Sequence, residues 1–401
     1  MIRYFLLAAG VGLAYYLYTP LPSYSPEPWK VQMLVHTSKL MYMVADLAEF
    51  IGYDTSLNIT RWQMKMMYND DATDEELLIS DDMFDGVTVR IYRPKSHKGL
   101  MPAVVYYPGC GFVMNGLVMH HQHSIALAKE TNTVVVTAQH RLAPEHPFPA
   151  AIEDSMAVLN YVMTNAESFG IDKKRVGVLG DSSGANVAVA VAMEHKSSKD
   201  VPNLKFLIMA YPSLQSLDLK TIPHGASRKP GAPVLIHTRR TIEYMMFYIF
   251  GFDGAKYVDD FLANNHTHYS LQKSKYAEYV NLENLPEKER KLYANETQIL
   301  GSRKDPLSLE ITKKILDPLV SGLMASDEQL QRLPPILHIT CEYDFALLDG
   351  LLFNTRLEKL GIDLVHLHYR GYPHGFIIPL NFLNGARNAW TAVVNFAKEK
   401  V

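Results

Sequence analysis

The sequence has few of the features that would mark a specialised protein class. Its 401 residues include only two cysteines and carry a net charge of −3, without a long basic run. Nucleic-acid binding needs clustered Lys and Arg, so the charge pattern argues against a nucleic-acid partner. Repeats, low-complexity tracts, phosphate loops and dinucleotide-binding motifs are missing as well, and we expect no cofactor. Apolar residues at 48% and charged residues at 20% are typical of a globular protein.

Histidine is more frequent than cysteine, with 16 residues, and three histidines lie close together at positions 120, 121 and 123. They open an expected helix and have no acidic or cysteine residue nearby at a spacing known for metal ligands. The sequence therefore predicts no metal site.

Long apolar runs are rare, and the clearest one is at the amino terminus. Arg3 is followed by an uncharged, mostly apolar run over residues 4–18, in which three of the last four residues are tyrosines. A membrane span usually needs about 20 apolar residues, so this run is short. Bulky tyrosines stand where signal cleavage needs small residues, and they suit a membrane interface. We predict a signal-anchor over residues 1–20, with residues 21–401 in the secretory lumen; a buried amino-terminal helix is the alternative.

Three Asn-x-Thr triplets agree with a luminal location. They begin at Asn58, Asn265 and Asn295, and all three lie outside the expected core strands. We interpret them as candidate glycosylation sites.

Apolar, β-branched runs alternate with helical patterns through the middle of the chain. The expected strands are residues 87–92, 103–107, 133–137, 176–179, 207–211, 336–340 and 364–369. Helical patterns between them include residues 122–131, 151–168 and 186–196. This alternation predicts an α/β fold with a mostly parallel sheet flanked by helices.

Two regions interrupt the alternation. Residues from about 22 to 80 look mostly helical, and residues from about 223 to 331 separate two core strands by more than an ordinary connection. We expect both regions to form a cap over the carboxyl edge of the sheet, where ligands bind in such folds.

The segment Gly180-Asp181-Ser182-Ser183-Gly184 fits the G-x-S-x-G nucleophile turn of α/β hydrolases. An expected strand precedes it and an expected helix follows it, as that turn requires. The amino terminus of this helix would place partial positive charge beside a developing oxyanion. Ser182 is therefore the candidate nucleophile.

A serine hydroxyl needs a base, and the base needs a carboxylate that orients it. In this fold the chain order is Ser, then Asp or Glu, then His. Asp344 and His374 each follow an expected strand, so both should lie at the same sheet edge as Ser182. Asp349 is the nearest rival to Asp344 as the catalytic acid. It falls in the following helix, where we expect it to cap the helix or to orient a neighbouring side chain.

Backbone N–H groups must also stabilise the oxyanion. One should come from Ser183, the residue after the nucleophile, and others from the loop at residues 108–112. Within that loop Cys110 and Gly111 are the candidate donors.

Together these segments resemble the hormone-sensitive-lipase branch of α/β hydrolases, and most closely the arylacetamide deacetylase family. The resemblance runs nearly end to end and rests on residues 18–22, 27–29, 141–145, 148–149, 180–186, 339–344 and 373–376. It implies a single-pass type II protein of the endoplasmic reticulum membrane with a luminal catalytic domain. It also implies hydrolysis of short-acyl esters or aryl amides of lipophilic compounds, with Ser182 as nucleophile, Asp344 as orienting acid and His374 as base.

The chain departs from this family in the oxyanion loop. Relatives carry His-Gly-Gly-Gly where this sequence reads Pro108-Gly109-Cys110-Gly111, and an arginine where it has Leu347. Two cysteines in a luminal protein favour a disulfide. Cys341 matches a disulfide-bonded position of the family, whose other cysteine lies a few residues beyond the Cys110 position, and we hypothesise that Cys110 takes that role in a Cys110–Cys341 disulfide; two unpaired thiols are the alternative.

The sequence thus predicts a membrane-anchored serine carboxylesterase or amidase acting on lipophilic small molecules. Because of the altered loop, a catalytically weak or inactive ligand-binding protein on the same fold stays open. A neutral-lipid lipase is the third hypothesis.

Overall fold

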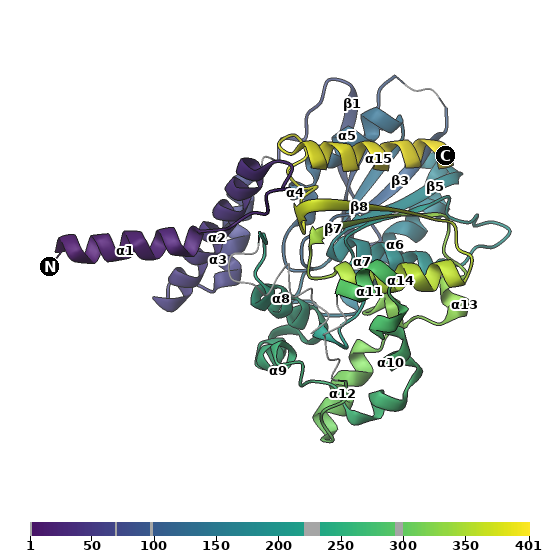
Figure 1. Ribbon diagram of the computed structural model, residues 1–401. Helices are drawn as coiled ribbons and strands as arrows, with labels where there is room; N and C mark the ends of the chain where they lie inside the picture. Colours follow the sequence, from purple (N-terminus) through teal and green to yellow (C-terminus); the bar gives the residue numbers. More distant parts are fainter. Residues whose placement is uncertain (1, 69, 97–98, 220–232, 293–299) are drawn as a thin grey trace.

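The computed structural model describes residues 2–68, 70–96, 99–219, 233–292 and 300–401. One twisted sheet of eight strands forms its centre, with helices on both faces (Figure 1). The strands are β1 (Leu77–Phe84), β2 (Val87–Pro94), β3 (Met101–Tyr107), β4 (Val134–Gln139), β5 (Ile171–Asp181), β6 (Leu207–Ala210), β7 (Ile336–Tyr343) and β8 (Leu364–Pro373).

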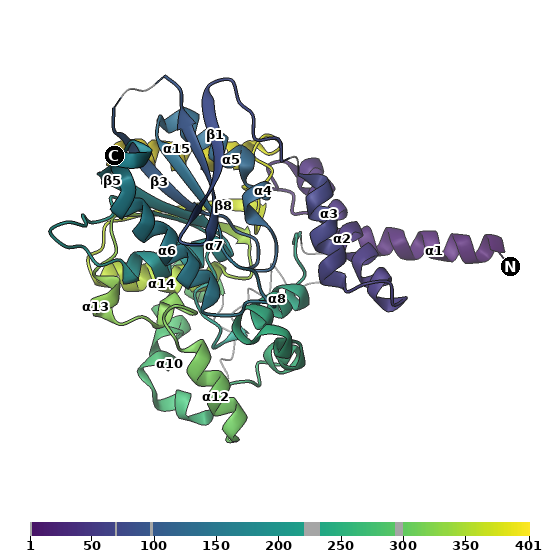
Figure 2. The same cartoon turned by 180° about the vertical axis from the view of Figure 1, so that it is seen from behind.

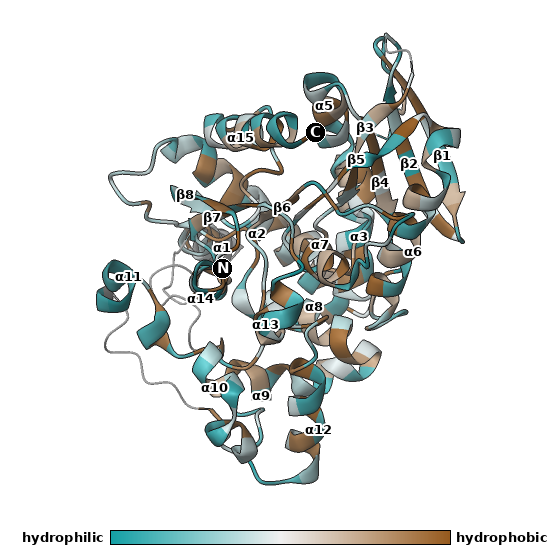
Figure 3. Ribbon diagram, turned by 90° about the vertical axis from the view of Figure 1, so that its right-hand side faces the viewer, coloured by the Kyte–Doolittle hydropathy of each residue, from teal (hydrophilic) through white to brown (hydrophobic). Residues whose placement is uncertain are grey.

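The spatial order of the strands is β1-β2-β4-β3-β5-β6-β7-β8. In this spatial order, neighbouring strands pair in parallel from β4 through β3 to β8, whereas β2 runs antiparallel to both β1 and β4. This confirms the predicted α/β fold with a mostly parallel sheet. Strands β3 and β4 are almost entirely buried, as expected of central strands covered on both faces, and they are largely brown in the hydropathy view (Figure 3).

Two apolar layers hold the helices against the sheet. The helices that flank the sheet are α5 (His121–Thr131), α6 (Ala150–Asn165), α7 (Ser183–Glu194), α14 (Leu347–Lys359) and α15 (Asn384–Lys400). Side chains of α5 and α15 pack on one face, and those of α6, α7 and α14 pack on the other (Figure 2).

The remaining helices do not flank the two faces of the sheet, and α1 projects away from the body (Figure 1). They are α1 (Ile2–Leu17), α2 (Pro28–Phe50), α3 (Ser56–Met67), α4 (Gly116–Met119), α8 (Thr238–Phe250), α9 (Val258–Leu262), α10 (Lys275–Tyr279), α11 (Glu287–Leu292), α12 (Pro306–Ile315) and α13 (Asp327–Leu330). Among the described residues, no helix has the length and apolar content needed to cross a membrane.

The amino-terminal segment is helical only as far as Met67. The prediction of a mostly helical segment up to residue 80 is wrong at its end, because residues 77–84 form the edge strand β1. Of the second irregular region, residues 223–232 and 293–299 lie outside the described residues, and the rest is mainly short helices.

Polar contacts fix α2 and α3 to the body. Glu27, which precedes α2, accepts hydrogen bonds from the Tyr372 hydroxyl (2.8 Å) and from the backbone N–H of Gly385 (3.2 Å). Arg61 of α3 donates to the carbonyl oxygens of Val113 (2.7 Å) and Ala143 (2.8 Å). Helix α2 is thereby fixed to β8 and α15, and α3 is fixed to the segments that follow β3 and β4.

Candidate active site

Ser182 occupies the sharp turn between β5 and α7. Its backbone is at φ 50° and ψ −125°, a region that is costly for a residue with a side chain. A Cβ atom on Gly180 would lie 2.1 Å from the carbonyl oxygen of Gly184, and a Cβ on Gly184 would lie 1.9 Å from that of Tyr107. Only glycine fits at these two positions, which explains why the turn that presents Ser182 needs them.

The structure brings the three predicted catalytic side chains together. His374 Nε2 lies 2.7 Å from Ser182 Oγ, and His374 Nδ1 lies 2.8 Å from Asp344 Oδ1. Asp344 follows β7 and is fully buried, and His374 follows β8 with only 8% of its surface exposed. Because the carboxylate accepts a hydrogen bond from the Nδ1–H group, Nε2 carries no proton and is left as an acceptor facing the serine hydroxyl.

The rival acid Asp349 lies on α14 and has a different partner. Its Oδ1 accepts a hydrogen bond from Nε2 of Gln215 at 2.9 Å. Burial raises the pKa of Asp349 to about 8, so this carboxyl is mainly protonated at neutral pH.

The oxyanion loop differs from the expected arrangement in one respect. The N–H of Cys110 donates to Ser183 Oγ at 2.9 Å, and the N–H of Phe112 donates to the same oxygen at 3.3 Å. The N–H of Gly111, by contrast, donates to no other described residue, and the N–H of Ser183 is unpaired within its helix because it belongs to the first turn. Two of the three predicted donors are thus available to a ligand, and Cys110 is engaged by the side chain of Ser183.

Two residues that the sequence interpretation missed support this loop. Asp181 is buried and accepts hydrogen bonds from the N–H of Gly109 (2.9 Å) and the hydroxyl of Tyr106 (3.0 Å), and its Oδ2 lies 3.1 Å from His120 Nε2. Burial alone would raise the pKa of Asp181, but the interaction with His120 and the Gly109 N–H lower it to about 2. In the sequence, the only signals for this pair are an aspartate inside the G-x-S-x-G motif and a histidine that has no assigned role.

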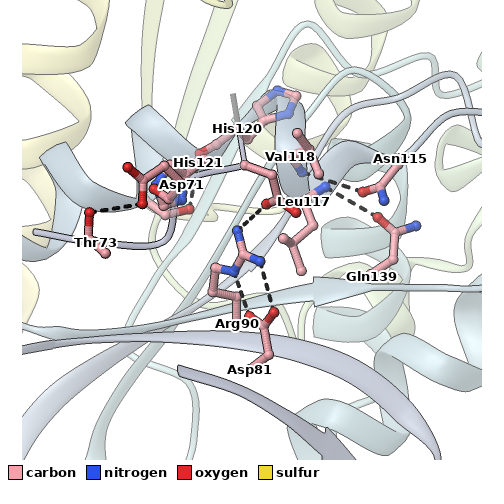
Figure 4. Close-up of polar contacts among 12 residues, drawn as sticks. Asp71, Thr73, Asp81, Arg90, Asn115, Leu117, Val118, His120, His121 and Gln139 are labelled. Carbon is pink, nitrogen blue, oxygen red and sulfur yellow. Dashed lines mark hydrogen bonds and ion pairs between the residues drawn. The ribbon is translucent and has the colours of Figure 1, made fainter. Parts of the chain in front are cut away.

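The other two clustered histidines have separate partners. His121 Nε2 lies 3.0 Å from the carbonyl oxygen of Asp71, beside the Arg90–Asp81 ion pair (Figure 4). His123 Nε2 lies 3.0 Å from the carbonyl oxygen of Ile377. Each ring is thus used in packing and hydrogen bonding.

Two apolar cavities flank the Ser182–His374 pair. The first, about 630 Å³ including space open to solvent, lies under α8. The second, about 890 Å³ on the same measure, lies under α2 and α3. Phe112 of the oxyanion loop stacks on Tyr248 of α8 at a centroid distance of 3.6 Å, which joins this helix to the loop. A ligand with two apolar parts can therefore occupy both sides of Ser182.

The structure contradicts the predicted disulfide, since Cys110 and Cys341 are both free and buried. Cys110 follows β3, whereas Cys341 lies within β7, three strands away in the sheet. Three strand spacings amount to about 14 Å, far beyond the Cα separation that a disulfide tolerates. The sulfur of Cys341 instead lies 3.6 Å from Asp344 Oδ2.

Two of the candidate glycosylation sites are exposed. Asn58 lies at the start of α3, and Asn265 lies after α9. Asn295 lies outside the described residues.

The sheet order, the strained serine turn and the Ser-His-Asp geometry define the chain as an α/β hydrolase. Residues 104–283 match a family model described as the alpha/beta hydrolase fold. The chain is 33% identical to bovine arylacetamide deacetylase over 384 residues, 93% of each protein, and 31% identical to rat neutral cholesterol ester hydrolase 1 over 400 residues, 95% of each. The chain belongs to the arylacetamide deacetylase family, and it is a hydrolase of the esterase type.

Solved structures agree with the fold. An esterase from the bacterial hormone-sensitive lipase family superposes with a TM-score of 0.62 at 16% identity, covering 92% of this chain and 98% of that one. An esterase from Pyrobaculum calidifontis gives 0.59 at 24% identity, covering 86% and 94%. Similarity at this level supports the architecture alone.

Proposed function

We propose that the chain is a serine carboxylesterase or amidase that works through an acyl-enzyme on Ser182. His374 Nε2 removes the serine proton as Oγ attacks the substrate carbonyl, and Asp344 stabilises the imidazolium that forms. His374 then gives this proton to the leaving alcohol or amine. A water molecule, deprotonated by the same histidine, releases the acid. The continuous hydrogen-bonded chain from Ser182 to Asp344 carries this proposal.

The oxyanion hole that fits this geometry consists of the N–H groups of Gly111 and Ser183 and the hydroxyl of Ser183. Two N–H groups occupy the lone pairs of Ser183 Oγ, and within the described residues no acceptor takes its proton. Ser183 also lines the first cavity beside Ser182. The Ser183 hydroxyl thus replaces the Cys110 N–H as a hydrogen-bond donor to the oxyanion. The Cys110 N–H contributes indirectly, because it donates to Ser183 Oγ and holds the hydroxyl in place.

The two cavities favour esters and amides whose acyl and leaving groups are both apolar. Phe112, Tyr244, Met245, Tyr248 and Ile249 line the first cavity, and the apolar side chains that line the second are mainly Met, with Leu, Tyr and Ile. Relatives named for arylacetamides and for cholesterol esters support a lipophilic substrate. Short-acyl esters and aryl amides are the first choice; the size of the second cavity also admits the longer chains of a neutral lipid.

The same proposal includes membrane attachment through residues 1–20, with the catalytic domain in the lumen of the endoplasmic reticulum. The uncharged run after Arg3 supports the attachment. The exposure of Asn58 and Asn265 agrees with a luminal domain.

Purified full-length protein should hydrolyse a short-chain chromogenic ester, and Ser182→Ala should abolish turnover. Ser155→Ala is the matched control, because Ser155 is a buried serine of α6 whose hydroxyl donates to the Ala151 carbonyl oxygen of the same helix at 2.7 Å. A fluorophosphonate probe should label the wild type and Ser155→Ala, and leave Ser182→Ala unlabelled. Equal background rates in all three proteins, with retained binding of an apolar ester, would favour the ligand-binding alternative. Hydrolysis rates across acyl chains of increasing length then separate an esterase from a lipase.

A further inference from the structure

Helix α2 carries apolar side chains on two opposite sides. One side packs against the body through Val31, Val35, Tyr42 and Ala45. The other side is exposed, and we call it the α2 outer face; it consists of Met33, Leu40, Val44, Leu47 and, at the end of the helix, Ile51. Their spacings of seven, four, three and four residues place them on one side of a helix. None is charged, although Leu47 is 57% exposed and Ile51 is 68% exposed.

A buried lysine joins the carboxyl end of α1 to the middle of α2. Lys39 Nζ donates to the carbonyl oxygen of Tyr16 and to Thr19 Oγ1, both at 2.9 Å. A cation at this position satisfies the unpaired carbonyls at the end of a helix and favours its dipole. From this junction α1 points away from the body, on the side where α2 and α3 lie (Figures 1 and 2). The α2 outer face is therefore fixed next to the base of α1.

The length of α1 indicates how deeply this base would sit in a bilayer. Its 16 residues rise about 24 Å, whereas the hydrocarbon core is about 30 Å thick. The difference is about 6 Å, which falls within the depth of about 5–10 Å at which interfacial helices bury their apolar side. If the α2 outer face is immersed to this depth, the base of α1 also lies inside the hydrocarbon core, and α1 can reach the opposite side of the bilayer.

The second cavity opens beside this face. Thr37 of α2 and Met67 of α3 line the cavity, and both are exposed, so they mark its mouth. Thr37 lies between Met33 and Leu40 along the same side of α2. From the mouth the cavity continues past Met41 to Ser182.

We propose that the α2 outer face rests in the interface of a lipid bilayer, and that apolar substrates enter the second cavity directly from the lipid, between α2 and α3. The proposal rests on the membrane attachment and the Ser182 chemistry proposed above. It adds that the bilayer contacts the α2 outer face and supplies the substrate.

Fluorescence quenching tests the contact with lipid. An environment-sensitive dye is attached to Leu47→Cys, and for comparison to Leu78→Cys on the exposed edge strand β1, in full-length protein reconstituted into phosphatidylcholine vesicles. Cys110 and Cys341 are buried, so labelling is selective. Nitroxide-labelled lipids should quench the dye at position 47, and iodide in the water should quench the dye at position 78.

Two results would overturn the lipid contact. One is free access of iodide to position 47 in the vesicles. The other is shielding of position 47 without vesicles, in a protein that sediments as a dimer, which would show that a second copy covers the face.

Kinetics test the entry route. The variant Leu40→Glu/Val44→Glu/Leu47→Glu should lose about tenfold or more of its rate on a long-chain ester embedded in vesicles, because charges on this side oppose immersion. Its rate on a water-soluble ester should be unchanged. Leu78→Glu/Met83→Glu places charges on β1 and should keep both rates. Equal rates of all three proteins on the embedded ester would refute the entry route. A wild type that fails on the water-soluble ester would instead refute the proposed hydrolase chemistry.

Discussion

Truncation of Ser183 tests the rearranged oxyanion hole. The Cys110 N–H lies 2.9 Å from Ser183 Oγ, and an oxyanion bound by the hydroxyl would lie one further hydrogen-bond length away. Ser183→Ala therefore removes a donor, and the Cys110 N–H cannot take its place without movement of the loop. Losing one oxyanion donor typically lowers kcat by about 10²–10³-fold, and we expect the lower end of that range, about 2.7 kcal/mol.

The assay is steady-state hydrolysis of a short-chain ester by wild type, Ser183→Ala and the control Ser155→Ala. The interaction exists only in the transition state, so kcat should fall while KM stays nearly constant. Equal melting temperatures would exclude a folding defect. An unchanged or higher kcat in Ser183→Ala would refute the reasoning, since it would mean that the hydroxyl only withholds the Cys110 N–H from the oxyanion.

Three further changes test other parts of the structure. Asp344→Asn should lower kcat by about 10⁴-fold in ester hydrolysis, because the amide no longer selects the productive His374 tautomer; a loss below tenfold would contradict this. Gly184→Ala should destabilise the fold by at least about 2 kcal/mol in urea unfolding, because its Cβ would meet the Tyr107 carbonyl at 1.9 Å. Burial raises the pKa of Asp349 in the folded protein from the ordinary 3.8 to about 8. Folding thus takes up a proton, and stability from this group falls as pH rises from 4 to 8. Asp349→Asn should show a weaker decline between pH 5 and 8, and identical pH profiles would contradict the buried, protonated carboxyl.

Much of the sheet could be predicted because its central strands are buried on both faces and therefore read as continuous apolar runs. Strand β1 could not. Among the described strands it pairs only with β2, most of its side chains are exposed, and it contains Asp81 and Asp82. Aspartate is depleted in strands, and an edge strand needs no apolar alternation on its open side. Its eight residues therefore resemble a polar connection until β2 is beside them.

The arrangement of Ser182, Asp344 and His374 could be predicted because each follows a recognisable strand, and the carboxyl ends of parallel strands share one edge of the sheet. The cysteine pair could not be predicted in this way. Whether two thiols meet depends on the spatial order of the strands, and β5 and β6 separate the two cysteines.

The oxyanion loop could not be predicted from its own sequence, because its position and its free N–H groups depend on contacts with Asp181 and Ser183. Its position is set by Asp181, which accepts the Gly109 N–H, so the loop is held even though Pro108 replaces a residue that could donate. Which of its N–H groups are free to bind a ligand depends on the Ser183 hydroxyl, which accepts the Cys110 N–H and lies 73 positions away in the chain. Because Asp181 and Ser183 both belong to the turn that carries Ser182, changes in the loop sequence leave the attachment of the loop to this turn intact. The altered loop can therefore still serve catalysis, provided that Ser183 supplies the proton that the Cys110 N–H no longer offers.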